Sequence, residues 1–296
     1  MESTLPSSMP KLYRAVATRA TRTNPPANCL VEKAKILMMS TNSLDLSKAN
    51  VLITGGSEGI GRGLAERFLK AGSTVFITGR NPAKLKRAVS DLPGLRTLVN
   101  DISKPEERIR LAHDLQSGLP DLNVVINNAG IQRRISLASD TAPWAERQIE
   151  IDTLFAGPVH LNSLLIPLLL KNGAGWIVNV TSAGGFIPQV FAPIYSACKA
   201  ALHSYTVALR HALQGTAIRV VELIPPAVQT GLAGQGATHG APLDLFCDDV
   251  FARLQGSEEA IGFGPTDTLE FKQLIEAPKP LFLASSARFP VVTYGN

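Results

Sequence analysis

Short apolar runs alternate with amphipathic helical patterns through most of this chain, and this alternation restricts the possible folds more than any other feature. Runs typical of buried strands occupy residues 49–54, 74–78, 96–99, 124–127, 176–180 and 218–224, with a seventh at 260–263. The first helical pattern stops at Gly72, and later ones occupy residues 82–89, 105–115, 144–170 and 194–213. This order predicts an α/β fold, a doubly wound parallel sheet with helices on both faces.

Length and composition favour one large domain with appendages. With 296 residues and 45% hydrophobic content, the chain can bury a sizeable core. We expect a core domain at residues 45–275, an extension at residues 1–44 and a tail at residues 276–296, to which no element is assigned. Residues 229–242 are rich in glycine and begin beyond the carboxyl end of a strand, so residues 229–246 are expected to form a mobile lid. The alternative is a featureless linker.

The basic charge of the chain is concentrated near its N-terminus. Residues 1–40 carry six Lys or Arg against two Glu, or +4 of the formal net charge of +5, so the remainder gives little support for nucleic-acid binding. Residues 11–22 are basic and free of acids, which is typical of a mitochondrial presequence. Alternatively, translation starts at Met38 or Met39, and the preceding residues are a disordered or gene-model extension. We expect a cytoplasmic protein, or a mitochondrial one if the presequence is real.

Cysteine, histidine and hydropathy patterns argue against several classes of protein. Cys29, Cys198 and Cys247 lack any paired spacing, which disfavours a disulfide framework or a structural zinc site. The histidines show no metal-ligand spacing, so no metal is expected, and only His239 in the lid is placed to touch a substrate. No run of about 18 apolar residues appears, so no membrane-spanning helix is expected.

A glycine-rich turn follows the first strand and opens the first helix. It reads Thr54-Gly-Gly-Ser-Glu-Gly-Ile-Gly61, a spacing that lets backbone amides approach a pyrophosphate while the helix N-terminus supplies partial positive charge. Such turns also occur without ligands, so the turn does not establish nucleotide binding by itself. After a strand and before a helix, it is typical of a Rossmann-type dinucleotide-binding fold.

The residues after the second and third strands bear on which nucleotide is bound. Thr78-Gly79-Arg80 lacks the carboxylate that an NAD-preferring site presents to the ribose 2′-hydroxyl, and Arg80 suits a 2′-phosphate, so NADP(H) is favoured over NAD(H). Glu58 opposes this preference if it points inward, and Arg80 is alternatively a solvated surface charge. Asp101 either accepts from the adenine amino group or caps a turn.

Three side chains in the second half of the chain are candidates for the chemistry. Tyr195 and Lys199 lie four residues apart on a predicted helix and share a face, so the ammonium is placed to lower the pKa of the phenol, normally ~10. A tyrosine tuned in this way exchanges a proton with a carbonyl or an alcohol. Ser182 ends the fifth strand, where its hydroxyl either donates to a substrate oxygen or caps a helix.

Together these motifs resemble the short-chain dehydrogenase/reductase family. The resemblance covers about residues 45–230, and its stretches after Asn127 and Ala201 look most like the DltE-type oxidoreductase branch. It rests on six features in the family's order: the glycine turn, Asp101, Asn127-Asn-Ala-Gly130, Ser182, Tyr195-x-x-x-Lys199 and residues 225–230.

The resemblance implies NADP(H)-dependent interconversion of a carbonyl and an alcohol. Tyr195 would be the acid and base, Lys199 would hold the nicotinamide ribose and lower the tyrosine pKa, and Ser182 would orient the carbonyl oxygen. The implied cofactor site comprises Gly55, Ser57, Gly59, Ile60, Gly61, Arg80, Asp101, Asn128, Tyr195, Lys199, Val228 and Thr230.

One position departs from the family pattern. The family commonly has an asparagine four residues before the proline of the Gly157-Pro158 step, where the long helix is expected to break or bend. That asparagine holds a water that links the lysine to solvent. This chain has Leu154 instead, and Asp152 or Thr153 can compensate only if the helix shifts register. Alternatively, Leu154 packs in the core and backbone carbonyls hold the water.

Two other functions and several properties of the protein stay open at this stage. The chain is alternatively a catalytically impaired nucleotide-binding or regulatory protein, or an epimerase or isomerase that uses transient oxidation. Broad apolar faces on helices 144–170 and 194–213 favour a homodimer or homotetramer. A fairly apolar pocket for a small organic substrate is suggested by Phe186, Ile187, Leu232, Ala233, Ala237 and Leu243.

Overall fold

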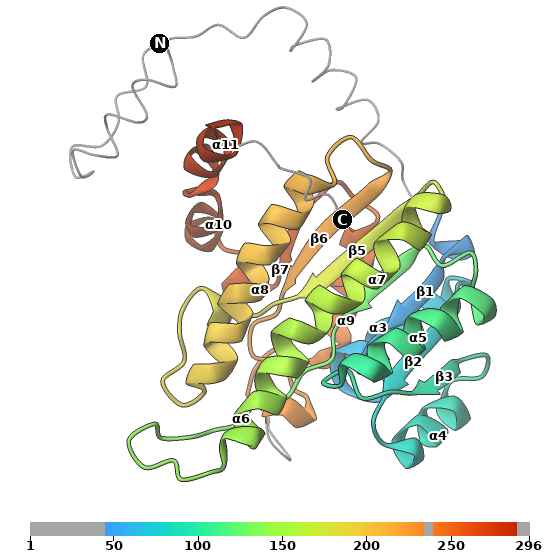
Figure 1. Ribbon diagram of the computed structural model, residues 1–296, viewed down its shortest axis with the longest axis horizontal. Helices are drawn as coiled ribbons and strands as arrows, with labels where there is room; N and C mark the ends of the chain where they lie inside the picture. The colour runs from blue at the N-terminus through green and yellow to red at the C-terminus, as the bar shows by residue number, and fades with distance from the viewer. Residues whose placement is uncertain (1–44, 234–238, 289–296) are drawn as a thin grey trace, which may run out of the picture. The chain divides into compact units, whose positions relative to one another are not determined.

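A parallel sheet of seven strands, in the order β3-β2-β1-β4-β5-β6-β7, forms the centre of the molecule's larger unit. The structure is a computed structural model that describes residues 45–233 and 239–288 (Figure 1). These residues fall into two compact units, residues 45–266 and residues 267–288. The strands are β1 (Asn50–Ile53), β2 (Thr74–Gly79), β3 (Arg96–Val99), β4 (Val124–Asn127), β5 (Gly175–Val180), β6 (Ile218–Ile224) and β7 (Ala260–Gly262).

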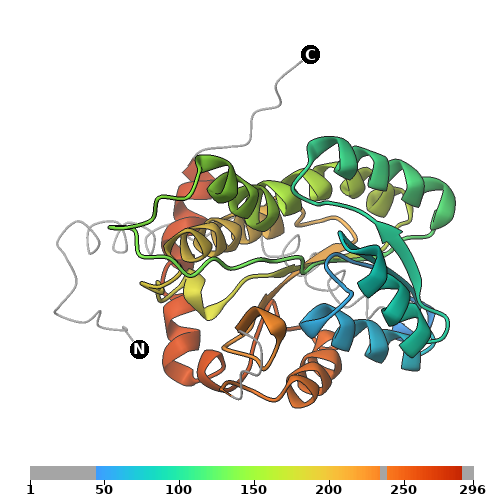
Figure 2. The ribbon, with the colours of Figure 1, turned by 90° about the horizontal axis from the view of Figure 1, so that it is seen from below.

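Helices cover both faces of this sheet (Figures 1 and 2). On one face lie α3 (Gly59–Lys70), α4 (Pro82–Asp91) and α9 (Leu243–Leu254). On the other face lie α5 (Pro105–Gly118), α7 (Gly157–Lys171) and α8 (Pro193–Ala212). The predicted doubly wound α/β fold is therefore confirmed. The unit also contains the short 3₁₀ turns η1 (Leu46–Lys48), η3 (Ala183–Gly185), η4 (Gly231–Ala233) and η5 (Gly264–Thr266).

The sequence of β1 is continuously apolar because both faces of this strand are buried. Val51 and Ile53 pack in the core beside α3, whereas Leu52 packs in the core beside α5. All three side chains are fully buried, because successive residues of a strand face opposite sides of a sheet that is covered twice.

The order of the strands reverses between β1 and β4. These two strands are neighbours, with Ile53 paired to Ile126, although β2 and β3 separate them in the sequence. Beyond the carboxyl ends of strands at such a reversal, an open α/β sheet leaves a crevice for ligands. The glycine turn follows β1 and Asn128 follows β4, so the two motifs meet at this crevice.

A π-helical turn, η2 (Asp152–Ala156), joins α6 (Trp144–Ile151) to α7. The sequence predicted that the helix breaks or bends at Gly157-Pro158. The helical backbone continues through this step, but the regular α-helical repeat is interrupted by the π turn just before it, and Pro158 lies in the first turn of α7, where proline is tolerated. A Cβ at Gly157 would lie 2.8 Å from the Asp152 carbonyl oxygen, so only glycine fits there. The π turn inserts one residue into the helical repeat and rotates its neighbours.

By length and composition alone, the helix from Trp144 to Lys171 is able to span a membrane. Its most apolar window is 44% buried, however, and Leu161, Leu165 and Leu169 pack into the core beside α5. This pattern is typical of a core helix of a globular protein.

Part of the segment predicted to form a lid is helical. Residues 243–246 form the first turn of α9, and Phe246 is fully buried there, so they are not part of a mobile segment. Residues 234–238, with Ala237, lie outside the described residues, as do residues 1–44 with Cys29 and the predicted presequence. The rest of the lid and the extension stay predictions.

Two helices that the sequence analysis did not predict make up the second unit. They are α10 (Leu269–Glu276) and α11 (Lys279–Arg288). Thr268 caps α10 by accepting from the Phe271 N–H at 3.2 Å. The core domain was expected to run to residue 275, whereas the first compact unit ends at Thr266.

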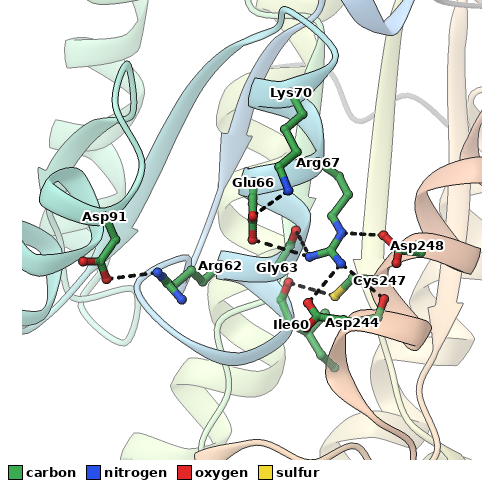
Figure 3. A network of polar contacts seen from close by, with 10 residues as sticks. All are labelled: Ile60, Arg62, Gly63, Glu66, Arg67, Lys70, Asp91, Asp244, Cys247 and Asp248. Carbon is green, nitrogen blue, oxygen red and sulfur yellow. Dashed lines mark hydrogen bonds and ion pairs between the residues drawn. The ribbon is translucent and has the colours of Figure 1, made fainter.

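Arg67 joins α3 to α9 within the first unit (Figure 3). Its Nε donates to Asp248 Oδ1 at 2.9 Å and its Nη2 donates to Asp244 Oδ1 at 3.0 Å. A Cβ at Gly63 would lie 2.5 Å from Cys247 Sγ, so glycine allows the two helices to approach closely. The helix after residues 229–242 is thereby fixed to the helix that follows the glycine turn.

Candidate active site

A cavity of about 550 Å³ lies at the carboxyl ends of the strands. It is lined by loops that follow the first six strands, β1 to β6, and by the first turns of α8. The predicted site residues that line it are Gly55, Ser57, Gly59, Ile60, Arg80, Asn128, Ser182, Tyr195, Lys199, Val228 and Thr230. Gly61 and Asp101 are not among the lining residues.

The glycine turn is tied closely to the end of β4. Asn128 Nδ2 donates to the carbonyl oxygens of Thr54 at 2.9 Å and Gly55 at 3.1 Å. Thr54 Oγ1 accepts from the N–H groups of Asn128 at 3.0 Å and Ala129 at 3.1 Å. A Cβ at Gly55 would lie 2.7 Å from Ala129 Cα, and one at Gly61 would lie 2.4 Å from Asn128 Nδ2. Gly61 therefore acts by leaving room for Asn128.

The N-terminus of α3 is available to an anion in the cavity. Gly59 has a φ of +57°, in the left-handed region that favours glycine, and it lines the cavity with Ile60. Glu58, the residue before the helix, makes no side-chain capping bond. The amide donors of the first turn are therefore free of a side-chain cap and suit a phosphate group.

Charged side chains line the part of the cavity next to β2. Arg80 lies there as predicted, together with Glu58 and with Lys84 of α4. Lys84 Nζ is 2.8 Å from each carboxylate oxygen of Glu58, so it compensates the acid that weighed against NADP(H). Sequence reasoning missed Lys84 because its partner is 26 residues away. The sequence feature that could have indicated Lys84 is its place in the first turn of the helix predicted after Arg80.

Asp101 caps a turn at the end of β3. Its Oδ1 accepts from the backbone N–H of Ser103 at 3.1 Å and from the Ser103 hydroxyl at 2.8 Å. Of the two alternatives for this residue, the turn cap describes its contacts in the structure.

Ser182, Tyr195 and Lys199 line the cavity together and are deeply buried, with 7%, 6% and 4% of their surfaces exposed. Ser182 Oγ accepts from the Gly184 N–H at 3.1 Å, and the Ser182 side chain is near enough to Tyr195 to affect the pKa of the phenol. Lys199 Nζ donates to the Val180 carbonyl oxygen at 2.6 Å and lies 5.7 Å from the centre of the Tyr195 ring. The three predicted residues thus line one and the same cavity.

Burial shifts the pKa values of both titratable groups. It raises the pKa of the Tyr195 phenol, a shift that the hydrogen bond with Ser182 opposes and the charge of Glu150 reinforces. It lowers the pKa of Lys199 to about 8. A lowered phenol pKa was expected from the sequence, and the direction in the structure is the opposite, because loss of solvent outweighs the hydrogen bond with Ser182.

Buried amides hold α7 and α8 against the strands beside these groups. Asn127 Nδ2 donates to Asn162 Oδ1 of α7 and to Asn179 Oδ1 of β5, both at 2.8 Å. Asn179 Nδ2 in turn donates to Thr206 Oγ1 of α8 at 2.9 Å. This network fixes the helix that carries Tyr195 relative to the carboxyl ends of β4 and β5.

The π turn puts Thr153, and not Leu154, at the cavity. Leu154 is fully buried and packs with Tyr195 and Cys198, as the core-packing alternative proposed. Thr153 lines the cavity with only 5% of its surface exposed, and its hydroxyl has no hydrogen-bond partner within residues 45–233 and 239–288. The register shift that the sequence analysis left open is therefore present.

Beyond Ser182, Tyr195 and Lys199, the cavity has both polar and apolar lining residues. Phe186, Ile187 and Leu243 do not line it, whereas Leu232 does. Its other lining residues include Gln132, Arg134, Gln189, Phe191 and His239. In the described part of the chain, no group of His, Cys, Asp or Glu side chains is arranged to hold a metal ion.

Comparisons with known proteins agree with this geometry. Residues 49–239 match the family described as short chain dehydrogenase. The uncharacterized oxidoreductase DltE of Bacillus subtilis is 42% identical over 189 residues, or 64% of this chain and 75% of that protein. Sulfoacetaldehyde reductase 2 of Chromohalobacter salexigens is 33% identical over 222 residues, or 73% of this chain and 88% of that protein.

A solved structure shares the fold at low sequence identity. The short-chain dehydrogenase from Sphingobium yanoikuyae in complex with NADPH has a TM-score of 0.71 and 23% identity, covering 84% of this chain and 99% of that one. Together, the family match, the relatives and the shared fold show that the chain belongs to the short chain dehydrogenase family of oxidoreductases.

Proposed function

We propose that this protein interconverts a carbonyl and an alcohol on a small organic substrate with NADP(H) as cofactor. One observation carries the proposal: a single cavity joins the uncapped N-terminus of α3 to Ser182, Tyr195 and Lys199. A phosphate-binding turn and a proton-donating tyrosine in one cavity are what hydride transfer to a carbonyl requires.

The lining residues fit a dinucleotide with a 2′-phosphate. Added Cβ atoms at Gly55 and Gly61 would meet the end of β4, so the turn is shaped for close backbone approach to a pyrophosphate. Arg80 and Lys84 supply positive charge next to β2, and Lys84 also offsets Glu58. When bound, the nicotinamide cofactor supplies or accepts the hydride.

The chain's own residues handle the proton. In reduction, Tyr195 donates its phenolic proton to the carbonyl oxygen, and Ser182 hydrogen-bonds the same oxygen. Lys199 uses one of its three N–H donors on the Val180 carbonyl, which leaves two for ribose hydroxyls. Its positive charge also stabilises the phenolate that Tyr195 becomes. Oxidation reverses these roles.

Thr153 supplies the polar group that Leu154 lacks. Its buried, unpartnered hydroxyl lines the same cavity as Lys199 and is suited to hold a water there. Protons then reach Lys199 from solvent without an asparagine. This assignment favours a working enzyme over the catalytically impaired alternative.

Titration of the protein with NADPH and NADH, followed by nicotinamide fluorescence and then by a panel of aldehydes and ketones, tests the proposal. We expect tighter binding of NADPH and turnover of at least one carbonyl compound. Tyr195→Phe should reduce turnover by about a hundredfold to ten-thousandfold while cofactor binding is retained, because only the proton donor is removed.

Tyr205→Phe is the matched control, since Tyr205 is a second partly buried tyrosine of α8 that does not line the cavity. Its turnover should stay within a few-fold of the native value. Full activity of Tyr195→Phe on a confirmed substrate would refute the mechanism, and consumption of no NADPH alongside product formation would favour the isomerase alternative.

A further inference from the structure

Glu222 is a buried acid of β6 to which the proposed reaction assigns no role. Only 1% of its surface is exposed, and its neighbour across the sheet is Asn179 of β5. A polar or charged group that is buried this deeply is costly unless it is hydrogen-bonded. The partners of this side chain therefore show which elements it connects.

Two other parts of the fold supply these partners. Thr181, directly after β5, donates its hydroxyl to Glu222 Oε1 at 2.7 Å. His203 Nδ1, on α8, lies 3.0 Å from Oε1 and 2.9 Å from Oε2. An ionised carboxylate only accepts hydrogen bonds, which makes Nδ1 the donor in this contact. Glu222 thus joins β6 both to the end of β5 and to α8.

His203 lies on the side of α8 that carries the catalytic groups. It follows Lys199 by four residues and Tyr195 by eight, so the three side chains form one row along the helix. Thr181 directly precedes Ser182, and it lines the cavity with 1% of its surface exposed. The carboxylate between His203 and Thr181 therefore connects the helix that carries Tyr195 to the residue next to Ser182.

The turn that follows Ser182 packs against the same helix. Phe186 directly follows η3, and the centre of its ring lies 4.4 Å from the centre of the His203 ring. A Cβ at Gly185 would lie 2.9 Å from the Lys199 carbonyl carbon, so the backbone of the turn approaches the helix closely. The turn is thus held at both ends, by the carboxylate contact before Ser182 and by the ring contact after it.

We infer that Glu222 and His203 are positioning residues, which hold Ser182 in place relative to Tyr195 for its hydrogen bond to the carbonyl oxygen. This inference rests on the proposed function, from which the role of Ser182 comes. The pair acts from behind the site, since neither residue lines the cavity. Misplacing a group by about 1 Å can cost about a hundredfold in rate, so such a contact is able to affect catalysis.

Hydrogen exchange tests this positioning without relying on turnover. In His203→Leu, which leaves Glu222 without its partner on α8, we expect the amides of residues 183–187 to exchange at least about tenfold faster, while those of β1 keep the native rate. Mass spectrometry of the full-length protein measures both. These amides donate within the turn and to β6: Ala183 to the Pro225 carbonyl, Gly184 to Ser182 Oγ, Gly185 to the Ser182 carbonyl, and Phe186 and Ile187 to the Ala183 carbonyl.

Two further variants assign the effect to the carboxylate contact. His203→Asn keeps an N–H donor near the position of Nδ1 and should restore most of the protection. Thr181→Val removes the hydroxyl that reaches Glu222 at nearly constant volume, so it should speed exchange as His203→Leu does. His160→Leu is the matched control, since His160 is a half-buried histidine of α7 that lies 3.3 Å from Arg108 Nη1 and does not line the cavity. It should keep the native exchange and the native kcat/KM.

A double-mutant cycle tests whether the pair acts through Ser182. On a carbonyl compound that the native protein reduces, His203→Leu should lower kcat/KM by about 10- to 100-fold with NADPH affinity unchanged. In a Ser182→Ala background, the same substitution should cost less than about threefold, because the group that it displaces is already absent. A role limited to the stability of the fold would give the same cost in both backgrounds.

The outcomes separate this inference from the proposed function. Native exchange at residues 183–187 in His203→Leu and Thr181→Val, a native kcat/KM in His203→Leu, or equal costs with and without Ser182 would overturn the inference. If His203→Leu fails to fold, Thr181→Val tests the same contact by removing one hydroxyl. Faster local exchange in a protein that transfers hydride in neither direction would support the positioning of the turn and overturn the proposed redox activity.

Discussion

Tyr195 and Lys199 show how strongly a residue's surroundings determine its chemistry. Burial raises the pKa of the phenol and lowers that of the ammonium to about 8. Tyr195 is therefore protonated at neutral pH, the state that reduction needs, whereas oxidation needs the phenolate. In the proposed reaction, the direction is therefore expected to depend on pH through two side chains that share one face of α8.

We predict opposite pH profiles for the two directions. Reduction should slow as pH rises through about 8, because Lys199 loses the charge that stabilises the developing phenolate. Oxidation should gain from alkaline pH, because more Tyr195 is ionised. The kcat/KM of a carbonyl compound without ionisable groups, and of its alcohol, measured across pH, checks this. A reduction rate that stays constant well above pH 8 would contradict the assignment to Lys199.

At the scale of elements, the π turn η2 determines which of two neighbouring side chains serves the site. Thr153→Val keeps the volume and removes the hydroxyl, so we predict a fall in kcat of about tenfold with cofactor affinity unchanged. Thr153→Ser should restore the rate. Stopped-flow measurement of hydride transfer alongside NADPH titration provides both values. An unchanged rate in Thr153→Val would show that the hydroxyl has no part in proton transfer.

Leu154 gives a contrast with Thr153. Because Leu154 is fully buried against Tyr195 and Cys198, an asparagine at this position would leave an unpartnered amide in the core. Restoring the family's residue in Leu154→Asn is therefore no route to a faster enzyme here, since the polar group it introduces lies in the core and away from the cavity.

Replacing a glycine by alanine should have opposite effects on stability in the glycine turn and at the end of α5. Gly61→Ala would bring a Cβ to 2.4 Å from Asn128 Nδ2, so we predict a destabilisation of about 1–3 kcal/mol and weaker NADPH binding. Gly118→Ala, where an added Cβ meets nothing within 4 Å, should stabilise the protein by about 0.5–1 kcal/mol. Urea unfolding and fluorescence titration measure both effects. Equal stability of the two variants would contradict the close approach at Gly61.

Most elements that position the site were predictable, and the exceptions have physical reasons. Strands such as β4 are buried on both faces and read as unbroken apolar runs. The π turn was not predictable, because one extra residue in a helical repeat leaves no mark in composition. The Lys84 to Glu58 contact spans 26 residues, and the cavity wall at Arg134 depends on how two loops meet. The helix α11 was not predicted because Pro278 and Pro280 argue against a helix, although Pro280 lies in the first turn, where proline is tolerated.

For the whole molecule, we predict a dimer or tetramer. The helix from Trp144 to Lys171 exposes large apolar side chains, with Trp144 61% and Ile149 41% exposed. Trp144→Asp should weaken association because it places a charge in a buried contact, whereas Ile109→Asp on α5 should not. Sedimentation equilibrium at micromolar concentration measures the mass. A native protein that sediments strictly as a monomer would refute this prediction.

The contact between α3 and α9 contains a buried cysteine, which makes it possible to measure how often the two helices separate. Cys247 is buried there, 3.9 Å from the Ile60 carbonyl oxygen, and burial raises the pKa of its thiol to about 12. A protonated, shielded thiol resists alkylation. In a background that lacks the other two cysteines, Cys29→Ser with Cys198→Ala, the rate at which a thiol reagent labels Cys247 therefore reports how often these two helices separate. A bound cofactor at the start of α3 should slow that labelling.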